Sequence, residues 1–182
     1  MRRIAVLLSI LMMSHLVSAS PEITVDLNLE RKLSDFDIGI KGGEISPDGE
    51  TVLIYGEDGY AHLLSASNAD DEATDIRLEK ETESALNDAT WHPGGKSALI
   101  VGDDGTILRF NSTNYALGEA EGSLAMAGID INSIHFTAGS SVAYLGTDSG
   151  QIWRYYADTF TLLNDEASSR ITDIDCLKNK NI

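Results

Sequence analysis

The chain has 182 residues, of which 42% are hydrophobic and 23% charged, so it can bury the core of an ordinary globular domain. Its formal net charge is −16, from 29 acidic and 13 basic side chains, and a surface of that charge repels phosphate backbones, which excludes nucleic acid as an expected partner. Cys176 is the only cysteine, so no disulfide forms within these residues.

The first nineteen residues are expected to form a signal peptide. Two arginines precede a mostly apolar run from Ile4 to Met13, and Val17-Ser18-Ala19 is a small-residue cleavage pattern. An uncleaved membrane anchor is the alternative, but Ser14 and His15 interrupt the run and leave it shorter than the ~20 residues of a spanning helix. We predict cleavage after Ala19 and a secreted, periplasmic or cell-surface protein, whose net charge changes from −16 to −18 with the loss of the two arginines.

Residues 20–39 are expected to lead into the repeated part of the chain. Apolar residues alternate with polar ones at Ile23, Val25, Leu27 and Leu29, and this period of two predicts a strand over 23–29. Such a strand can close a ring of repeats by joining the last one.

A repeat organises residues 40–182. Three apolar runs end in Gly56, Gly102 and Gly146, and these glycines are 46 and 44 residues apart, a spacing typical of propeller blades of about 40 to 50 residues. A strand and a turn such as Ser46-Pro47-Asp48-Gly49 precede each run, and an acidic Gly-containing turn and a third strand follow it. Each unit is therefore predicted to contain a meander of three antiparallel strands.

A fourth, more polar strand completes each predicted blade, over 74–79, 115–119 and 159–163. The sequence thus predicts an all-β propeller of four-stranded antiparallel blades at about 40–80, 86–120 and 131–164, with the first strand of a fourth blade starting at 171. A partial ring leaves apolar blade faces in water, so we expect the chain to continue beyond Ile182 or to self-associate.

Alternation in the first strand of each blade predicts which side chains are buried. Ile45, Trp91 and Phe136 share one position, and Gly43, Ala89 and Ile134 lie two residues earlier on the same face. In the last segment, Ile174 and Cys176 are expected to point inward, and Asp173 and Asp175 outward. We predict that Trp91 and Phe136 are buried between blades.

Two pieces of the chain, Ser46-Pro47-Asp48-Gly49 and 102–110, resemble the WD40-like repeat family, and the resemblance extends over about residues 40–176. The Trp-Asp dipeptide of that family is replaced by Leu64-Ser65, Phe110-Asn111 and Tyr155-Tyr156. A second resemblance, of 146–153, is to the Asp-box turn of sialidase-type and photosystem-assembly-type propellers. The WD40-like resemblance implies a rigid interaction platform, which in an exported chain binds at or outside the cell envelope.

No catalytic, cofactor-binding or metal-binding residue is predicted. The histidines His62, His92 and His135 lie in different units without a second ligand at metal-binding spacing. The acids Asp58, Asp104 and Asp148 recur at the same turn, where aspartate serves as a turn former. There is no Gly-x-Ser-x-Gly motif, Cys176 falls at a core position, and Asn111-Ser112-Thr113 is a glycosylation acceptor pattern.

Two function classes remain from the sequence. The first is an exported, non-enzymatic propeller that requires no cofactor and presents its loops and central channel to a protein or a small ligand. The second is the N-terminal part of an exported propeller hydrolase or oxidoreductase whose catalytic residues lie beyond residue 182. A propeller fold supports both classes.

Overall fold

The computed structural model describes residues 39–67, 74–166 and 168–176, all of which belong to one compact unit. The predicted signal peptide and the predicted strand over 23–29 lie outside the described residues. No helix in the described ranges is long and apolar enough to cross a membrane.

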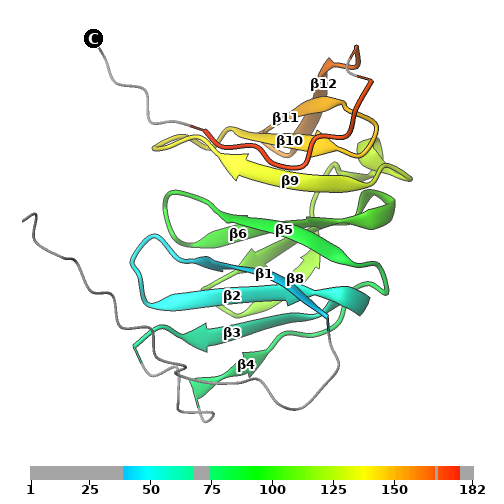
Figure 1. Ribbon diagram of the computed structural model, residues 1–182. Coiled ribbons are helices and arrows are strands. Elements are labelled where there is room, and N and C mark those ends of the chain that lie inside the picture. Colours follow the sequence, from blue (N-terminus) through cyan, green and yellow to red (C-terminus); the bar gives the residue numbers. More distant parts are fainter. Residues whose placement is uncertain (1–38, 68–73, 167, 177–182) are drawn as a thin grey trace, which may run out of the picture. The chain divides into compact units, whose positions relative to one another are not determined.

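Three four-stranded antiparallel sheets make up the described part, which confirms the predicted fold class (Figure 1). Blade 1 contains β1 (Ile40–Ile45), β2 (Thr51–Gly56), β3 (Ala61–Ser65) and β4 (Ile76–Arg77). Blade 2 contains β5 (Leu86–Trp91), β6 (Ser97–Gly102), β7 (Ile107–Asn111) and β8 (Ala116–Glu119). Blade 3 contains β9 (Ile131–Phe136), β10 (Ala143–Thr147), β11 (Ile152–Tyr156) and β12 (Thr159–Asn164), and three short 3-10 turns occur at η2 (Glu57–Gly59), η4 (Asp103–Gly105) and η5 (Ser123–Met126).

Acidic turns join the second and third strands of each blade. In η2 and η4 the middle residues Asp58 and Asp104 have φ of 52° and 55°, a left-handed conformation that aspartate tolerates. The glycine after Asp104 is required, because a Cβ on Gly105 (φ +76°) would lie 2.2 Å from the Met126 carbonyl oxygen. Sequence periodicity therefore located these turns correctly.

The third acidic turn differs by one position from the predicted pattern. The backbone N–H of Asp148 donates to the Asp130 carbonyl at 2.9 Å, as the N–H of Asp103 donates to the Ala85 carbonyl at 3.0 Å. Asp148 thus occupies the first position of its turn, and Ser149 stands where the other turns have Asp58 and Asp104. Asp148 is a turn residue, but it is not the residue equivalent to those two.

Apolar side chains between neighbouring blades form two core clusters. One joins blades 1 and 2 and contains Trp91, and the other joins blades 2 and 3 and contains Phe136. Trp91 is 7% exposed and Phe136 is 5% exposed, which confirms the prediction that both are buried between blades. Ile45 has the same register but is 61% exposed, because its face of blade 1 has no neighbouring blade among the described residues.

The fourth strands are shorter or shifted relative to the predicted ones. β4 is limited to Ile76–Arg77 instead of 74–79, and β12 extends to Asn164. β8 starts at Ala116, because Tyr115 has φ of 56° and belongs to the preceding turn. An outer strand pairs with a neighbouring strand on one side only. Its sequence is polar and lacks a clear alternation, so the sequence does not show at which residues the strand begins and ends.

Residues 171–176 form no assigned strand, although the sequence predicts one there. The segment nevertheless lies along β9: Ile174 N donates to Ser133 Oγ at 2.8 Å, and Asn132 Nδ2 donates to the Ile171 carbonyl at 3.0 Å. Ile174 and Cys176 are half-buried and Asp173 and Asp175 exposed, as the alternation predicts. No described strand pairs with the segment to form a ladder, and for that reason it is not assigned as β.

Candidate functional site along the inner strands

Polar side chains concentrate where the first strands of the blades meet. β1, β5 and β9 each form one edge of their own sheet, and β5 contacts both β1 and β9. The segment 171–176 continues this row beside β9. These four segments are called the inner strands below.

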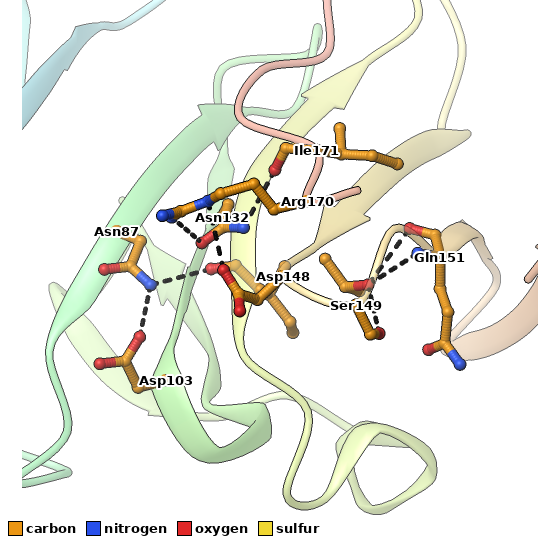
Figure 2. Close-up of polar contacts among 10 residues, drawn as sticks. Asn87, Asp103, Asn132, Asp148, Ser149, Gln151, Arg170 and Ile171 are labelled. Atoms are coloured by element: carbon orange, nitrogen blue, oxygen red, sulfur yellow. Dashed lines mark hydrogen bonds and ion pairs between the residues drawn. The ribbon is translucent and has the colours of Figure 1, made fainter. Parts of the chain in front are cut away.

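One residue per blade links the inner strands near the start of each strand. Lys41 Nζ donates to Asn87 Oδ1 at 2.9 Å, and Asn87 Nδ2 donates to the Ile131 carbonyl at 3.0 Å. Asn132 Nδ2 repeats this contact with the Ile171 carbonyl at 3.0 Å (Figure 2). The three residues hold the second position of their inner strands, so one place in the repeat provides a link to the next blade.

The acidic turns, which lie between the second and third strands of each blade, contact the linking side chains. Lys41 pairs with Glu57 at 3.0 Å, and Asn87 Nδ2 donates to Asp103 Oδ1 at 2.7 Å. In blade 3 a cation intervenes, since Arg170 contacts Asp148 at 3.2 Å and donates to Asn132 Oδ1 at 3.2 Å (Figure 2). The acidic turns therefore orient the linking side chains.

The third acidic turn closes on itself. Thr147 Oγ1 lies 3.0 Å from Ser149 Oγ, and Gln151 N donates to Thr147 Oγ1 at 2.9 Å (Figure 2). These bonds hold the turn within residues 146–153, the segment that resembles an Asp-box turn, so the polar side chains there have a structural role.

Asp88 joins three blades at the middle of the inner strands. Its carboxylate accepts hydrogen bonds from Tyr55 OH at 3.1 Å, from its neighbour Ala89 N at 2.8 Å and from Ile134 N at 2.8 Å. Burial raises the pKa of Asp88 in spite of these donors, because it disfavours the charged form. The same burial, with the nearby Asp88 charge, raises the pKa of Tyr55.

Further along the inner strands lie Glu44 and His135, which are half-buried, and Asp175, which is exposed. Burial, followed by the charge of Asp88, raises the pKa of Glu44, while nearby His135 lowers it. His135 Nε2 lies 3.7 Å from Asp175 Oδ1. We call Glu44, Asp88, His135 and Asp175 the inner acidic cluster; it presents oxygen acceptors and a negative potential, which suit a cationic or hydrogen-bond-donating group.

The three histidines that the sequence singled out do not come together. His62 pairs with Asp75 at 3.3 Å within blade 1, and both side chains are largely buried. His92 is a turn residue as predicted, since its Nδ1 accepts from Gly94 N at 3.0 Å. The described residues contain no group of three or more His, Cys, Asp or Glu side chains that could hold a metal ion.

A pocket of about 220 Å³ opens between blades 2 and 3, beside His92, Phe136 and Tyr155. Arg109 Nη2 donates there to Tyr155 OH and to Asp158 Oδ1, and Tyr155 OH donates to Asp158 Oδ1 at 2.8 Å. The bond from Arg109 lowers the pKa of Asp158, whereas burial raises the pKa of Tyr155. Sequence reasoning missed this triad.

Two further residues singled out in the sequence are Asn111, of the glycosylation acceptor pattern, and Cys176, which was placed at a core position. Asn111 is exposed at the end of β7, and its Oδ1 accepts from Thr113 N at 2.9 Å. Cys176 is half-buried, with its thiol 3.7 Å from the His135 carbonyl, and burial raises the pKa of that thiol.

Three meandering blades that pack through their first strands define a section of a β-propeller. No family model and no curated protein matches the sequence. Solved structures that share this fold include WD40-repeat propellers. U3-55K aligns with a TM-score of 0.65 and 12% identity, and the alignment covers 82% of this chain and 46% of the U3-55K chain. The WD40 repeats of RRP9 align with a TM-score of 0.63 and 13% identity, and the alignment covers 82% of this chain and 46% of the RRP9 chain. Sqt1 from Chaetomium thermophilum aligns with a TM-score of 0.60 and 15% identity, and the alignment covers 74% of this chain and 37% of the Sqt1 chain.

These similarities confirm, at the level of the fold, the resemblance to WD40-like propellers that the repeat suggested. The chain spans less than half the length of each of these three structures.

Proposed function

We propose that this chain is an exported, non-enzymatic interaction platform that binds a basic segment of a partner protein along its inner strands. The inner acidic cluster is the observation that carries this proposal, because it gathers carboxylates from blade 1, blade 2 and the segment 171–176 around His135 of blade 3. A WD40-type propeller supports such a role, because it presents a rigid surface built from many strands. Lysine or arginine side chains of the partner supply the complementary charge.

The pair formed by His92 and Ser141 supports a non-enzymatic role. His92 Nε2 lies 2.8 Å from Ser141 Oγ, a distance at which a histidine can activate a serine nucleophile. The Nδ1 atom of His92, however, accepts a hydrogen bond from the Gly94 N–H. In the neutral ring the proton therefore resides on Nε2, which donates to the serine and cannot act as its base.

Peptide binding tests the proposed site. A fluorescein-labelled peptide of alternating Lys and Ser is titrated into the chain, and its anisotropy is compared with that of a Glu-Ser peptide. Combining Glu44→Gln with Asp175→Asn should weaken binding of the basic peptide about tenfold, because hydrogen bonds to charged groups are lost. Both substitutions keep the shape of the surface.

The matched control is Glu121→Gln with Asp165→Asn, which removes the same charge from two exposed acids elsewhere in the described part. It should leave the affinity nearly unchanged. An equal loss in the control would show that the net charge of −16 attracts the peptide without a specific site.

Export forms the second part of the proposal and rests on the N-terminal pattern of the sequence. Material recovered outside the cytoplasm should start at Ser20 when its N-terminus is sequenced. Chains that retain Met1 in a membrane fraction would instead indicate an uncleaved anchor.

A further inference from the structure

The glycosylation acceptor pattern Asn111-Ser112-Thr113 lies on an exposed turn of blade 2. β7 ends at Asn111 and β8 starts at Ala116, and all residues from 111 to 116 are exposed except the half-buried Ser112. The Ser112 N–H donates to the Lys96 carbonyl at 3.0 Å. The turn is therefore anchored to the preceding hairpin, and its first asparagine is open to solvent.

The side-chain amide of Asn111 presents its nitrogen to solvent. Its Oδ1 accepts from Thr113 N at 2.9 Å, whereas its Nδ2 donates to no residue in the described ranges. Asn87 and Asn132 differ, because their Nδ2 atoms donate to backbone carbonyls of the next inner strand. The Thr113 hydroxyl likewise has no hydrogen-bond partner within the part of the chain that the structure describes. Both groups that an N-linked acceptor site requires are therefore accessible.

Asn114 in the same turn provides an internal comparison. It is exposed as well, and its Oδ1 accepts from Ala116 N at 3.2 Å, again from the residue two positions later. The two asparagines of the turn differ in that third residue, which is Thr113 for Asn111 and Ala116 for Asn114. Asn111-Ser112-Thr113 is the only Asn-x-Ser/Thr pattern in the 182 residues. The turn therefore contains two accessible asparagines, of which one has the hydroxyl that the pattern requires.

The turn is uncharged, although the chain as a whole is strongly acidic. Residues 110–118 contain no Asp, Glu, Lys or Arg, whereas the net charge of the chain is −16. The oligosaccharide donor of N-glycosylation is a lipid whose sugar is linked through an anionic phosphate. An uncharged acceptor turn approaches such a donor without the local repulsion that an acidic turn would meet.

We infer that Asn111 is N-glycosylated by a lipid-linked oligosaccharide when the chain is exported, an inference that rests on the export part of the proposed function. Asn111 Nδ2 forms a bond to C1 of the first sugar, and the bond from C1 to the phosphate oxygen of the lipid breaks. The electron pair of the broken bond stays on that oxygen, and the amide gives up one proton to the released phosphate. The glycan is attached to the outer strands of blade 2, whereas the inner acidic cluster lies along the inner strands.

Mass spectrometry of the exported protein from the cells that make it tests the inference. Trypsin cleaves after Arg109 and next after Arg154, so Asn111, Asn114 and Asn132 fall in one peptide. Electron-transfer fragmentation should locate an added sugar mass on Asn111 and none on the other two asparagines. Exported protein in which Asn111 is unmodified would overturn the inference.

Cell-free translation of the full chain with glycosylating microsomes separates this inference from the proposed export. Loss of residues 1–19 speeds the migration of the imported chain in a denaturing gel, whereas glycosylation slows it, so the two events give different bands. Import and cleavage without glycosylation would overturn the inference and leave the export proposal intact. Absence of import would contradict export instead. Residues 1–19 are then replaced by the signal peptide of a secreted protein, and an imported chain without the glycan would again overturn the inference.

Substitutions in the turn are the matched controls for the microsome experiment. Thr113→Val keeps the shape of the side chain but removes the hydroxyl, so it should abolish the glycosylated band, whereas Thr113→Ser should retain it. Asn111→Gln should abolish the band, and adding Ala116→Thr to it should restore the band through Asn114. Because these positions are exposed, the substitutions should not affect folding. A glycosylated band that persists in Asn111→Gln alone would overturn the assignment to Asn111.

Discussion

Replacing Trp91 with alanine tests the packing between blades 1 and 2 most directly. Trp91 is 7% exposed, meets Phe110 edge-on with ring centroids 5.6 Å apart, and donates from Nε1 to the Glu44 carbonyl at 3.2 Å. A large-to-small change at such a site costs about 3 to 5 kcal/mol. Within that sum, the edge-to-face contact and the hydrogen bond contribute roughly 1 kcal/mol each.

The loss is measured by urea unfolding of the chain at pH 7, followed by far-ultraviolet circular dichroism. Trp91→Phe keeps an aromatic ring but leaves the Glu44 carbonyl without its donor, so it should cost less than Trp91→Ala. Leu124→Ala is the surface control, because Leu124 is 83% exposed and its truncation should change stability by less than about 0.5 kcal/mol. A loss below about 1 kcal/mol for Trp91→Ala would refute the assigned packing.

Two further substitutions test the pocket triad and the acidic turns. Arg109 lowers the pKa of Asp158, so the ionised Asp158 carboxylate stabilises the folded chain above the pKa that Asp158 has in the unfolded chain. This contribution to stability is lost as the pH falls through the lowered pKa of the folded chain. Asp158→Asn should therefore make the free energy of unfolding less dependent on pH below about pH 4, as measured by urea unfolding at several pH values. Gly105→Ala should lower the thermal unfolding midpoint more than Gly128→Ala does, because both glycines have positive φ but only Gly105 has a carbonyl, that of Met126, in the way. Equal shifts for the two alanine variants would contradict the proposed steric clash.

The strands and tight turns were predictable because local patterns determine them. A period of two marks β5 and β9, and the Asp-Gly pairs at 58–59 and 104–105 require a conformation with positive φ. The strand β4 was predicted over 74–79, but its short extent, Ile76–Arg77, was not predictable from its own residues. An outer strand packs on one side only, so its sequence tolerates polar residues and its ends depend on its neighbour.

The contacts between blades could not be read from residue types. Lys41, Asn87 and Asn132 hold the same position and each bonds to the next inner strand, although one is a lysine and two are asparagines, and two of the three bonds go to backbone carbonyls. One signal was nevertheless present. Arg109 and Tyr155 are 46 residues apart, as are Asp88 and Ile134, so polar residues one repeat length apart are the pairs to examine. The repeat length that identifies the fold also identifies its contacts.

The exposed face of blade 1 leads to a last prediction, about association. Ile40 and Ile45 are 49% and 61% exposed, although Ile45 holds the position at which Trp91 and Phe136 are buried. An apolar sheet face in water favours association, so the chain from Ser20 to Ile182 should self-associate in size-exclusion chromatography in a concentration-dependent way. Ile45→Ser should reduce this association and change the unfolding free energy by less than about 0.5 kcal/mol, since an exposed side chain contributes little to the fold. Arg154→Gln should leave the association unchanged, because Arg154 lies on blade 3 and not on this face. A monodisperse monomer with a sharp, concentration-independent thermal transition would show that the exposed face needs no partner.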